Sequence, residues 1–206
     1  MSLLKKSVLL VTLIIVADQV LKIWIKTHMA LRESISIIGD RVLIHFTENP
    51  GMAFGIELFG SSGKLLLTLA RVVFIGILAW FTWRQIRRKA PTGLVLGLSA
   101  MCAGALGNLI DCLFYGVIFS ASTYTQVAQL FPAEGGYEAF GFGKVVDMLY
   151  FPVIQTTYPS WFPFNAGEPF TFFRPIFNLA DAAITCSVFY LLIFQRSLFS
   201  KDEQIA

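Results

Sequence analysis

The sequence predicts an all-α polytopic membrane protein with four transmembrane helices, a small extracytoplasmic β-sheet and an extracytoplasmic loop region. Three observations support this fold class. Hydrophobic residues make up 56% of the 206 residues and charged residues only 14%, whereas an ordinary soluble domain carries roughly 25% charged residues. Four apolar runs have the length of a membrane helix. The basic residues gather where one side of the membrane would be, and the chain length suits a single membrane domain, residues 1–206.

The predicted membrane helices are set by length and apolar content, since about 20 mostly apolar residues span a bilayer. Four segments qualify, approximately residues 7–25, 64–85, 92–118 and 176–194. The first follows Lys5 and Lys6 and imitates a secretory signal peptide. No small-residue cleavage site follows it and apolar residues resume after Asp18, so a retained first helix is expected.

The distribution of basic residues predicts the orientation, because cytoplasmic loops carry an excess of Lys and Arg. The basic residues before the first helix, between the second and third, and after the fourth fall on one side if both termini are cytoplasmic: Lys5, Lys6, Arg84, Arg87, Arg88, Lys89, Arg196 and Lys201. The two long connections, approximately residues 27–63 and 119–175, are then extracytoplasmic. The net charge of +3 is too small to favour nucleic acid as a partner.

The two predicted extracytoplasmic connections differ in composition. In the first, residues 42–47 show the period of two that is typical of a strand, and Pro50-Gly51 is a turn signal. A small sheet on the membrane surface is expected there. The second connection is rich in Gly, Pro and aromatic residues, and Trp, Tyr and Phe at this density suit the membrane–water interface.

Polar residues of the apolar segments are predicted to converge near the outer membrane surface. A helix rises about 1.5 Å per residue, so its direction and the residue's position give an approximate depth. The residues placed in or near the outer leaflet come from separate segments: Asp18, Lys22, Arg71, Asn108, Asp111, Asp147, Asn178 and Asp181. Charge inside a membrane is costly and indicates a functional site.

Several of these residues also have a purely structural explanation when taken alone. Asp18 and Lys22 have the i, i+4 spacing of a helix-stabilising ion pair, and Arg71 can extend to the outer headgroups. Asn178 followed by Asp181 has the pattern of a helix N-cap with an acidic N3 residue. Their convergence, rather than any single residue, favours a site.

Three carboxylates in this group, those of Asp111, Asp147 and Asp181, have few cations among them. The structural alternative for Asp147 is a pairing with nearby Lys144. Two carboxylates that share a poorly solvated site do not easily both ionise, so such a pair can act as acid and base. This is the arrangement of an aspartic protease, and an outer-leaflet position implies a membrane-anchored substrate.

Other classes of function fit the residue pattern less well, and a metal site is not expected. His28 and His45 lie at or beyond helix ends without ligand spacing. Cys102, Cys112 and Cys186 lie in apolar runs without a paired spacing. A transporter or channel also uses intramembrane charge, but its polar residues would spread through the whole membrane thickness. A metal-dependent lipid-modifying enzyme would carry several closely spaced Asp residues on one helix, or His ligands.

Five motifs give the chain a resemblance to the lipoprotein signal peptidase family, the signal peptidase II enzymes, which are bacterial intramembrane aspartyl peptidases. They occur in the family's order over nearly the whole chain: Asp18-Gln-x-x-Lys22, Asn49-Pro-Gly51-Met-Ala-Phe54, Gly104-Ala-Leu-Gly-Asn108-Leu-Ile-Asp111, Val145-Val-Asp147 and Phe177-Asn178-x-Ala-Asp181. The resemblance implies that Asp147 and Asp181 form the catalytic dyad. It implies that other motif residues shape and support the site: Asp18, Lys22, Asn49, Gly51, Asn108, Asp111 and Asn178.

The resemblance also implies a substrate and a location. The substrate is a diacylglyceryl-modified prolipoprotein, cut just before its lipid-bearing cysteine at the outer face of the bacterial cytoplasmic (inner) membrane. Membrane lipids and globomycin-type cyclic peptides are the other expected partners, and a monomer that needs no cofactor is expected. An inactive family member that acts as a binding protein is the remaining alternative, and the presence of both Asp147 and Asp181 argues against it.

The chain departs from the family pattern in two respects. Cys112 directly follows Asp111 where the family usually has Arg, and Arg71 or Arg174 is a candidate replacement for the missing cation. Residues 120–143 and 156–174 look like inserted loops, which are expected to lie on the outer surface around the cleft.

Overall fold

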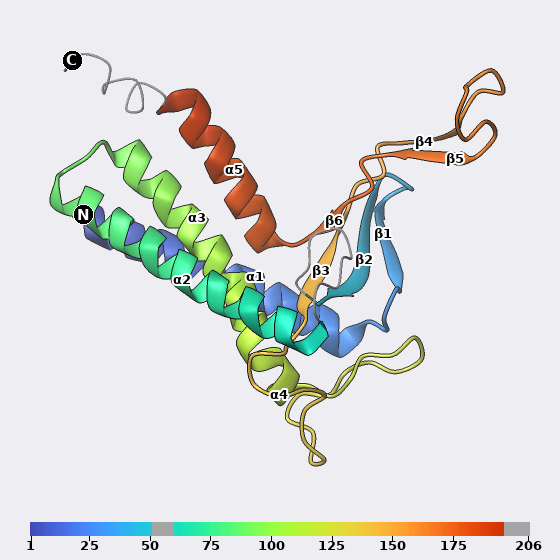
Figure 1. Ribbon diagram of the computed structural model, residues 1–206, viewed down its shortest axis with the longest axis horizontal. Coiled ribbons are helices and arrows are strands. Elements are labelled where there is room, and N and C mark those ends of the chain that lie inside the picture. The colour runs from blue at the N-terminus through green and yellow to red at the C-terminus, as the bar shows by residue number, and fades with distance from the viewer. Residues whose placement is uncertain (51–59, 196–206) are drawn as a thin grey trace.

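The computed structural model describes residues 1–50 and 60–195 of the chain. Its helices are α1 (Leu3–His28), α2 (Gly60–Arg87), α3 (Thr92–Ile110), the π-helical turn Asp111–Tyr115, α4 (Gly116–Ile118) and α5 (Leu179–Phe194). Its strands are β1 (Ser34–Ile38), β2 (Val42–Asn49), β3 (Val145–Tyr150), β4 (Ile154–Thr157), β5 (Pro169–Phe172) and β6 (Ile176–Phe177). The long helices form a bundle with the strands gathered beyond one end (Figure 1). The N-terminus, the α2–α3 link and the end of α5 lie at the opposite end.

Three of the described helical segments are long and apolar enough to cross a membrane: Leu3–His28, Gly63–Arg87 and Thr92–Ile118. They correspond to the first three predicted spans. The fourth apolar helix, α5, has 16 residues, fewer than the about 20 that a span usually needs. Its predicted start at residue 176 is wrong, because Ile176–Phe177 form strand β6 and Asn178 caps the helix.

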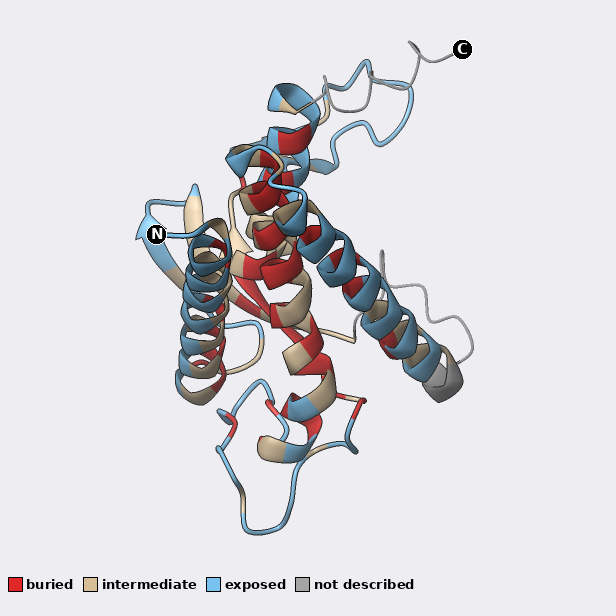
Figure 2. Ribbon diagram, turned by 90° about the vertical axis from the view of Figure 1, so that its left-hand side faces the viewer, coloured by how far each residue is buried: buried red, intermediate tan, exposed pale blue. Residues whose placement is uncertain are grey.

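Helix α3 is the centre of the bundle and packs against α1, α2 and α5. About half of its residues are buried, as the central helix in Figure 2 shows. Gly104 permits a close approach of α3 to α5, because an added Cβ would collide with the Ala180 carbonyl oxygen. By contrast, α1 and α2 expose large apolar side chains such as Leu13 and Phe74. An exposed apolar surface of this kind suits contact with lipid.

Four strands form an antiparallel sheet in the order β1-β2-β3-β6. The strand predicted at residues 42–47 is confirmed, and it lies within β2. In the β2–β3 pairing, Thr47 lies opposite Asp147 and Asn49 lies opposite Val145. A buried apolar cluster joins this sheet to the end of α1 and to the residues that follow α3: Ile25, Met29, Phe46, Tyr115, Phe119, Ala128, Val146 and Met148.

The all-α part of the predicted fold class is wrong, because β4 and β5 also form a separate antiparallel hairpin. Apolar periodicity gave no sign of β3, whose first four residues are all buried. Because these four buried residues include Asp147, β3 shows neither the alternation of a half-buried strand nor a continuous apolar run. With only two residues, β6 is too short for any periodic pattern.

Residues 120–143, one of the predicted inserted loops, fold back against the end of the third span. In this described stretch the backbone forms an isolated bridge between Phe119 and Leu130 but no named helix or strand. The Gly143 amide donates to the Cys112 carbonyl oxygen at 2.8 Å, and the Tyr137 amide donates to the Phe119 carbonyl oxygen at 3.0 Å. These hydrogen bonds hold the loop against the residues that follow α3, and the loop leads directly into β3.

Candidate active site

Asp147 lies at the middle of the four-stranded sheet, on β3, and its side chain is only 5% exposed. Because side chains alternate along a strand, the register of β3 decides which face this carboxylate occupies. Its Oδ1 atom accepts a hydrogen bond from Asn178 Nδ2 at 2.7 Å. This bond links the strand to the start of α5.

Asp181 lies in the first turn of α5, where a capping box holds it. Asn178 Oδ1 accepts from the Asp181 amide at 2.8 Å, and the Asn178 amide donates to Asp181 Oδ2 at 3.3 Å. The predicted N-cap is therefore confirmed. The second oxygen, Oδ1, accepts from Asn108 Nδ2 at 2.7 Å, so both carboxylate oxygens of Asp181 are held in place.

Two amide side chains bridge the two carboxylates. Asn178 donates to Asp147, Asn108 donates to Asp181, and Asn178 Nδ2 also lies 3.1 Å from Asn108 Oδ1. Asn178 is completely buried. The bridge joins β3, α3 and α5, which are far apart in the sequence, and it fixes both acids relative to each other.

The environment of Asp147 favours its protonated form. Burial raises the pKa of Asp147, the nearby Asp181 charge raises it further, and hydrogen bonds from Asn178 and Asn49 together with the Lys22 charge oppose the rise. The result is a pKa of about 7. The pair can therefore hold one proton at neutral pH, which is the condition for combined acid and base chemistry.

A buried ion cluster of Asp18, Lys22 and Asp111 lies beside the carboxylate pair and contacts it through Asn108. Lys22 Nζ lies 2.8 Å from Asp18 Oδ2 and 2.8 Å from Asp111 Oδ2, and it donates to Asn108 Oδ1 at 2.9 Å. The predicted pairing of Asp18 with Lys22 is confirmed, and Asp111 joins it from the third span. All three charged side chains are at most 1% exposed, so each depends on the others for compensation.

The same cluster holds the elements that carry the two acids. Asp18 Oδ1 accepts from the Ala180 amide at 2.9 Å, which ties α1 to the N-terminus of α5. Asp111 Oδ2 accepts from the Val146 amide at 3.3 Å, which ties the third span to β3. Gly107 gives Asp18 the space it needs, because an added Cβ would lie 2.8 Å from Asp18 Oδ2. Asp18 and Asp111 are therefore positioned beside the pair and anchor it.

Gln19 is a site residue that the sequence reasoning did not single out, although it stands inside the first motif. Its Nε2 atom donates to Asp111 Oδ1 at 2.9 Å and to the Gly107 carbonyl oxygen at 3.2 Å. Its Oε1 atom accepts from the buried Tyr115 hydroxyl at 3.1 Å. Its i, i+3 spacing to Lys22 on one helix face could have identified it.

The remaining expected site residues, Asn49 and Gly51, belong to the stretch between α1 and α2. Asn49 is the last residue of β2, opposite Val145 in the sheet, and its side-chain hydrogen bond to Asp147 lowers the pKa of that carboxyl. Gly51 lies outside the described residues.

Cys112, which stands where the family pattern has Arg, receives a cation from another helix. Arg71 Nη1 on α2 donates to Cys112 Sγ at 2.8 Å. Arg174, the other candidate, is exposed on the stretch before β6. Of the two candidates, Arg71 is therefore the one that brings its positive charge to Cys112.

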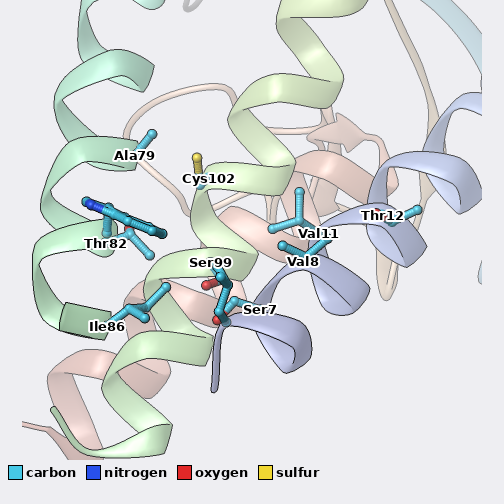
Figure 3. Close-up of a pocket in the computed structure, with 11 residues that line it drawn as sticks. Ser7, Val8, Val11, Thr12, Ala79, Thr82, Ile86, Ser99 and Cys102 are labelled. Atoms are coloured by element: carbon cyan, nitrogen blue, oxygen red, sulfur yellow. The ribbon is translucent and has the colours of Figure 1, made fainter. Parts of the chain in front are cut away.

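Residues 1–50 and 60–195 contain no group of three or more His, Cys, Asp or Glu side chains arranged to hold a metal ion. An apolar pocket of about 220 Å³ lies between α1, α2 and α3 (Figure 3), and neither Asp147 nor Asp181 lines it. Of its polar lining, Thr82 and Ser99 bond carbonyl oxygens of their own helices. This pocket offers no acid or base, so the carboxylate pair is the candidate active site.

Fold and site together define a class of protein: a membrane protein with several apolar helices and two aspartates bridged by amide side chains. A family model described as "Signal peptidase (SPase) II" matches residues 10–197. The chain therefore belongs to the signal peptidase II family and is an aspartic peptidase.

Individual relatives agree with the family model. The chain is 49% identical to the lipoprotein signal peptidase of Porphyromonas gingivalis over 185 residues, which cover 89% of this chain and 80% of that protein. It is 32% identical to the lipoprotein signal peptidase of Amoebophilus asiaticus over 195 residues, covering 93% and 78%. A solved bacterial membrane enzyme shares the fold, with a TM-score of 0.61 and 22% identity over 98% of this chain and 94% of that one.

Proposed function

We propose that this enzyme removes the signal peptide from diacylglyceryl-modified prolipoproteins by cutting just before the lipid-bearing cysteine. The observation that carries the proposal is the pair of aspartates, Asp147 and Asp181, joined through Asn178 at the mouth of the helix bundle. The relatives named lipoprotein signal peptidase support the substrate class. Asp18, Lys22, Asn49, Gly51, Asn108 and Asp111 are proposed to shape and support this site.

The raised pKa makes Asp147 the member of the pair that holds the proton. Asp181, whose oxygens accept from Asn108 and Asn178, is the ionised base. It takes a proton from water as the water oxygen attacks the scissile carbonyl, while the Asp147 proton stabilises the carbonyl oxygen. The intermediate then collapses, the C–N bond breaks, and the leaving amine of the cysteine takes a proton from Asp181.

The proposed location is the outer leaflet of the bacterial inner membrane, with α5 as the fourth span and both termini cytoplasmic. The N-terminus and the α2–α3 link lie at the bundle end opposite the sheet (Figure 1). Lys5 and the basic residues between 84 and 89 belong to these parts of the chain, so the positive-inside rule supports this orientation. We propose one membrane domain over residues 1–206 that acts as a monomer without a cofactor. Membrane lipids surround it, and globomycin-type cyclic peptides would block its site.

The decisive test replaces each acid by its uncharged isostere. Asp147→Asn and Asp181→Asn should each abolish cleavage of a lipidated prolipoprotein by the purified enzyme in detergent, because either change removes the acid–base pair. Both variants should remain folded in thermal unfolding. The matched control is Asp40→Asn, which changes an exposed carboxylate on the β1–β2 turn. Undiminished cleavage by Asp147→Asn or Asp181→Asn would contradict the assignment of these residues as the catalytic pair. If the unmodified enzyme cleaves an unlipidated substrate equally well, the proposed lipid-modified substrate class is wrong.

A further inference from the structure

The β4–β5 hairpin presents a cluster of large apolar side chains that the rest of the protein does not cover. Trp161 is 78% exposed and Phe164 is 74% exposed, and three more aromatic residues of the stretch are at least partly exposed: Phe162, Phe172 and Phe173. Residues 154–174 carry only two charged side chains, those of Glu168 and Arg174. A soluble surface rarely carries such a patch unless it binds something.

The hairpin has a defined structure held by its own ring contacts and backbone hydrogen bonds. The Tyr158 ring stacks on Phe162 and meets Phe170 edge-on, with ring centroids 5.1 Å apart in each case. The Tyr158 amide donates to the Glu168 carbonyl oxygen at 2.9 Å, and the Gly167 amide donates back to the Tyr158 carbonyl oxygen at 3.0 Å. This inner cluster fixes the turn. Trp161 meets Phe162 edge-on, with ring centroids 6.1 Å apart, and both Trp161 and Phe164 stay largely exposed.

The position of the hairpin places these side chains beside the proposed outer membrane surface. It extends sideways from the sheet, across the direction of the long helices (Figure 1). It therefore lies alongside the outer ends of the spans, over the region that lipid around the bundle would occupy. Aromatic side chains are enriched at this membrane level, and the near absence of charge removes the cost of placing the hairpin there.

We propose that the β4–β5 hairpin is a membrane-interface anchor whose exposed aromatic side chains insert at the headgroup–acyl boundary of the outer leaflet. The hairpin joins the strand that carries Asp147 to the strand that precedes Asp181. Its insertion would thus hold both acids at a fixed height above the acyl chains. This contact with lipid goes beyond the proposed peptidase activity and does not depend on it.

The test uses Trp161 as its own depth probe. The chain has four Trp residues, and replacing Trp24, Trp80 and Trp83 by Phe leaves Trp161 alone. In phosphatidylcholine nanodiscs, lipids brominated near the headgroup end of the acyl chain should lower Trp161 emission about twofold, and lipids brominated near the chain end much less. Emission like that of Trp in water, quenched by acrylamide and untouched by either lipid, overturns the proposal.

A second arm separates the anchor from other occupants. Trp161→Ser/Phe164→Ser should raise KM for the lipidated substrate severalfold in nanodiscs, with kcat and detergent activity unchanged. Gln155→Ser, at an exposed non-aromatic position of β4, should change nothing. If brominated lipids do not quench Trp161 and the protein runs as a dimer in size-exclusion chromatography, the hairpin binds a second copy of this chain, and the lipid assignment is overturned. Bromine quenching is measured without substrate, so it stands or falls separately from the peptidase assignment.

Discussion

Asn178 performs two tasks with one side chain. Its oxygen caps α5, and its nitrogen donates to Asp147 while lying 3.1 Å from Asn108 Oδ1. A carboxylate pair needs a fixed separation to share a proton, and this buried amide supplies the link between strand and helix. The cap alone is readable from the sequence, but the bridge exists only once β3 and α5 are brought together.

The two tasks of Asn178 can be separated by substitution. Asn178→Ala should lose the cap, at a cost of about 1 kcal/mol in stability, and should lower kcat by about a hundredfold because the acids are no longer bridged. Asn178→Ser keeps a capping oxygen, so it should recover the stability but not the activity. Thermal unfolding and cleavage kinetics measure the two effects. Full activity in Asn178→Ser would show that the bridge is dispensable.

The raised pKa of Asp147 predicts a loss of activity in alkaline solution. Burial and the Asp181 charge raise this pKa from 3.8 to about 7, so above about pH 7 Asp147 gives up the proton that polarises the carbonyl and both acids are ionised. A fit of kcat against pH should show an alkaline limb near this value. The same shift means that folding favours the protonated acid, so its contribution to stability is lost as the pH rises to about 7. A kcat that stays constant up to about pH 9 contradicts this assignment.

At the scale of elements, hydropathy was enough to find the helices but not most of the strands. The three long spans and β2 follow from apolar runs and from alternation, which are properties of local sequence. β3 and β6 are paired strands whose existence depends on partners distant in the chain. The β4–β5 hairpin falls within what the sequence showed only as an insertion. In the same way, the depth estimate predicted that the polar residues lie at one level. The contacts of Gln19 and Arg71 could not be predicted, because they depend on how the helices pack.

The close contact of α3 with α5 predicts that residue 104 has to be glycine. Gly104→Ala places a Cβ against the Ala180 carbonyl oxygen and close to Ile184. Since backbone has to move, this substitution should cost about 1–3 kcal/mol and displace Asp181, lowering both the unfolding temperature and activity. Gly76→Ala on α2 is the matched control, because nothing lies within 4 Å of the added atom. Equal unfolding temperatures for the two variants would refute the packing argument.

At the scale of the whole molecule, a second ion cluster, centred on the buried Glu48 carboxylate, joins the bundle to the four-stranded sheet and to the loop at residues 120–143. Lys26 of α1 forms an ion pair with Glu48 of β2 and donates to Ser122 of the loop at 2.9 Å. Lys144, just before β3, lies 3.4 Å from Glu48. Four segments of the chain thus share the buried Glu48 carboxylate, which follows directly after Thr47, the residue opposite Asp147 in the sheet.

This cluster predicts a large effect from one substitution outside the carboxylate pair. Glu48→Gln leaves the Lys26 charge buried without its counterion, which typically costs about 3–5 kcal/mol, and should loosen the loop at residues 120–143. Proteolysis of the loop and thermal unfolding would detect it. Glu134→Gln changes an exposed carboxylate of the same loop and should be silent. A Glu48→Gln protein as resistant to protease as the control would contradict a joining role.

The shortness of α5 has a consequence for the bilayer itself. Its 16 residues rise about 24 Å, whereas the hydrocarbon core is about 30 Å thick. As the proposed fourth span it is mismatched, and lipids beside it must compress or tilt to cover it. The membrane would be thinnest next to the helix that begins with Asp181. A diacylglyceryl anchor diffusing in the outer leaflet would there find its glycerol level with the acids, so the bilayer's own deformation would bring the scissile bond to the right height.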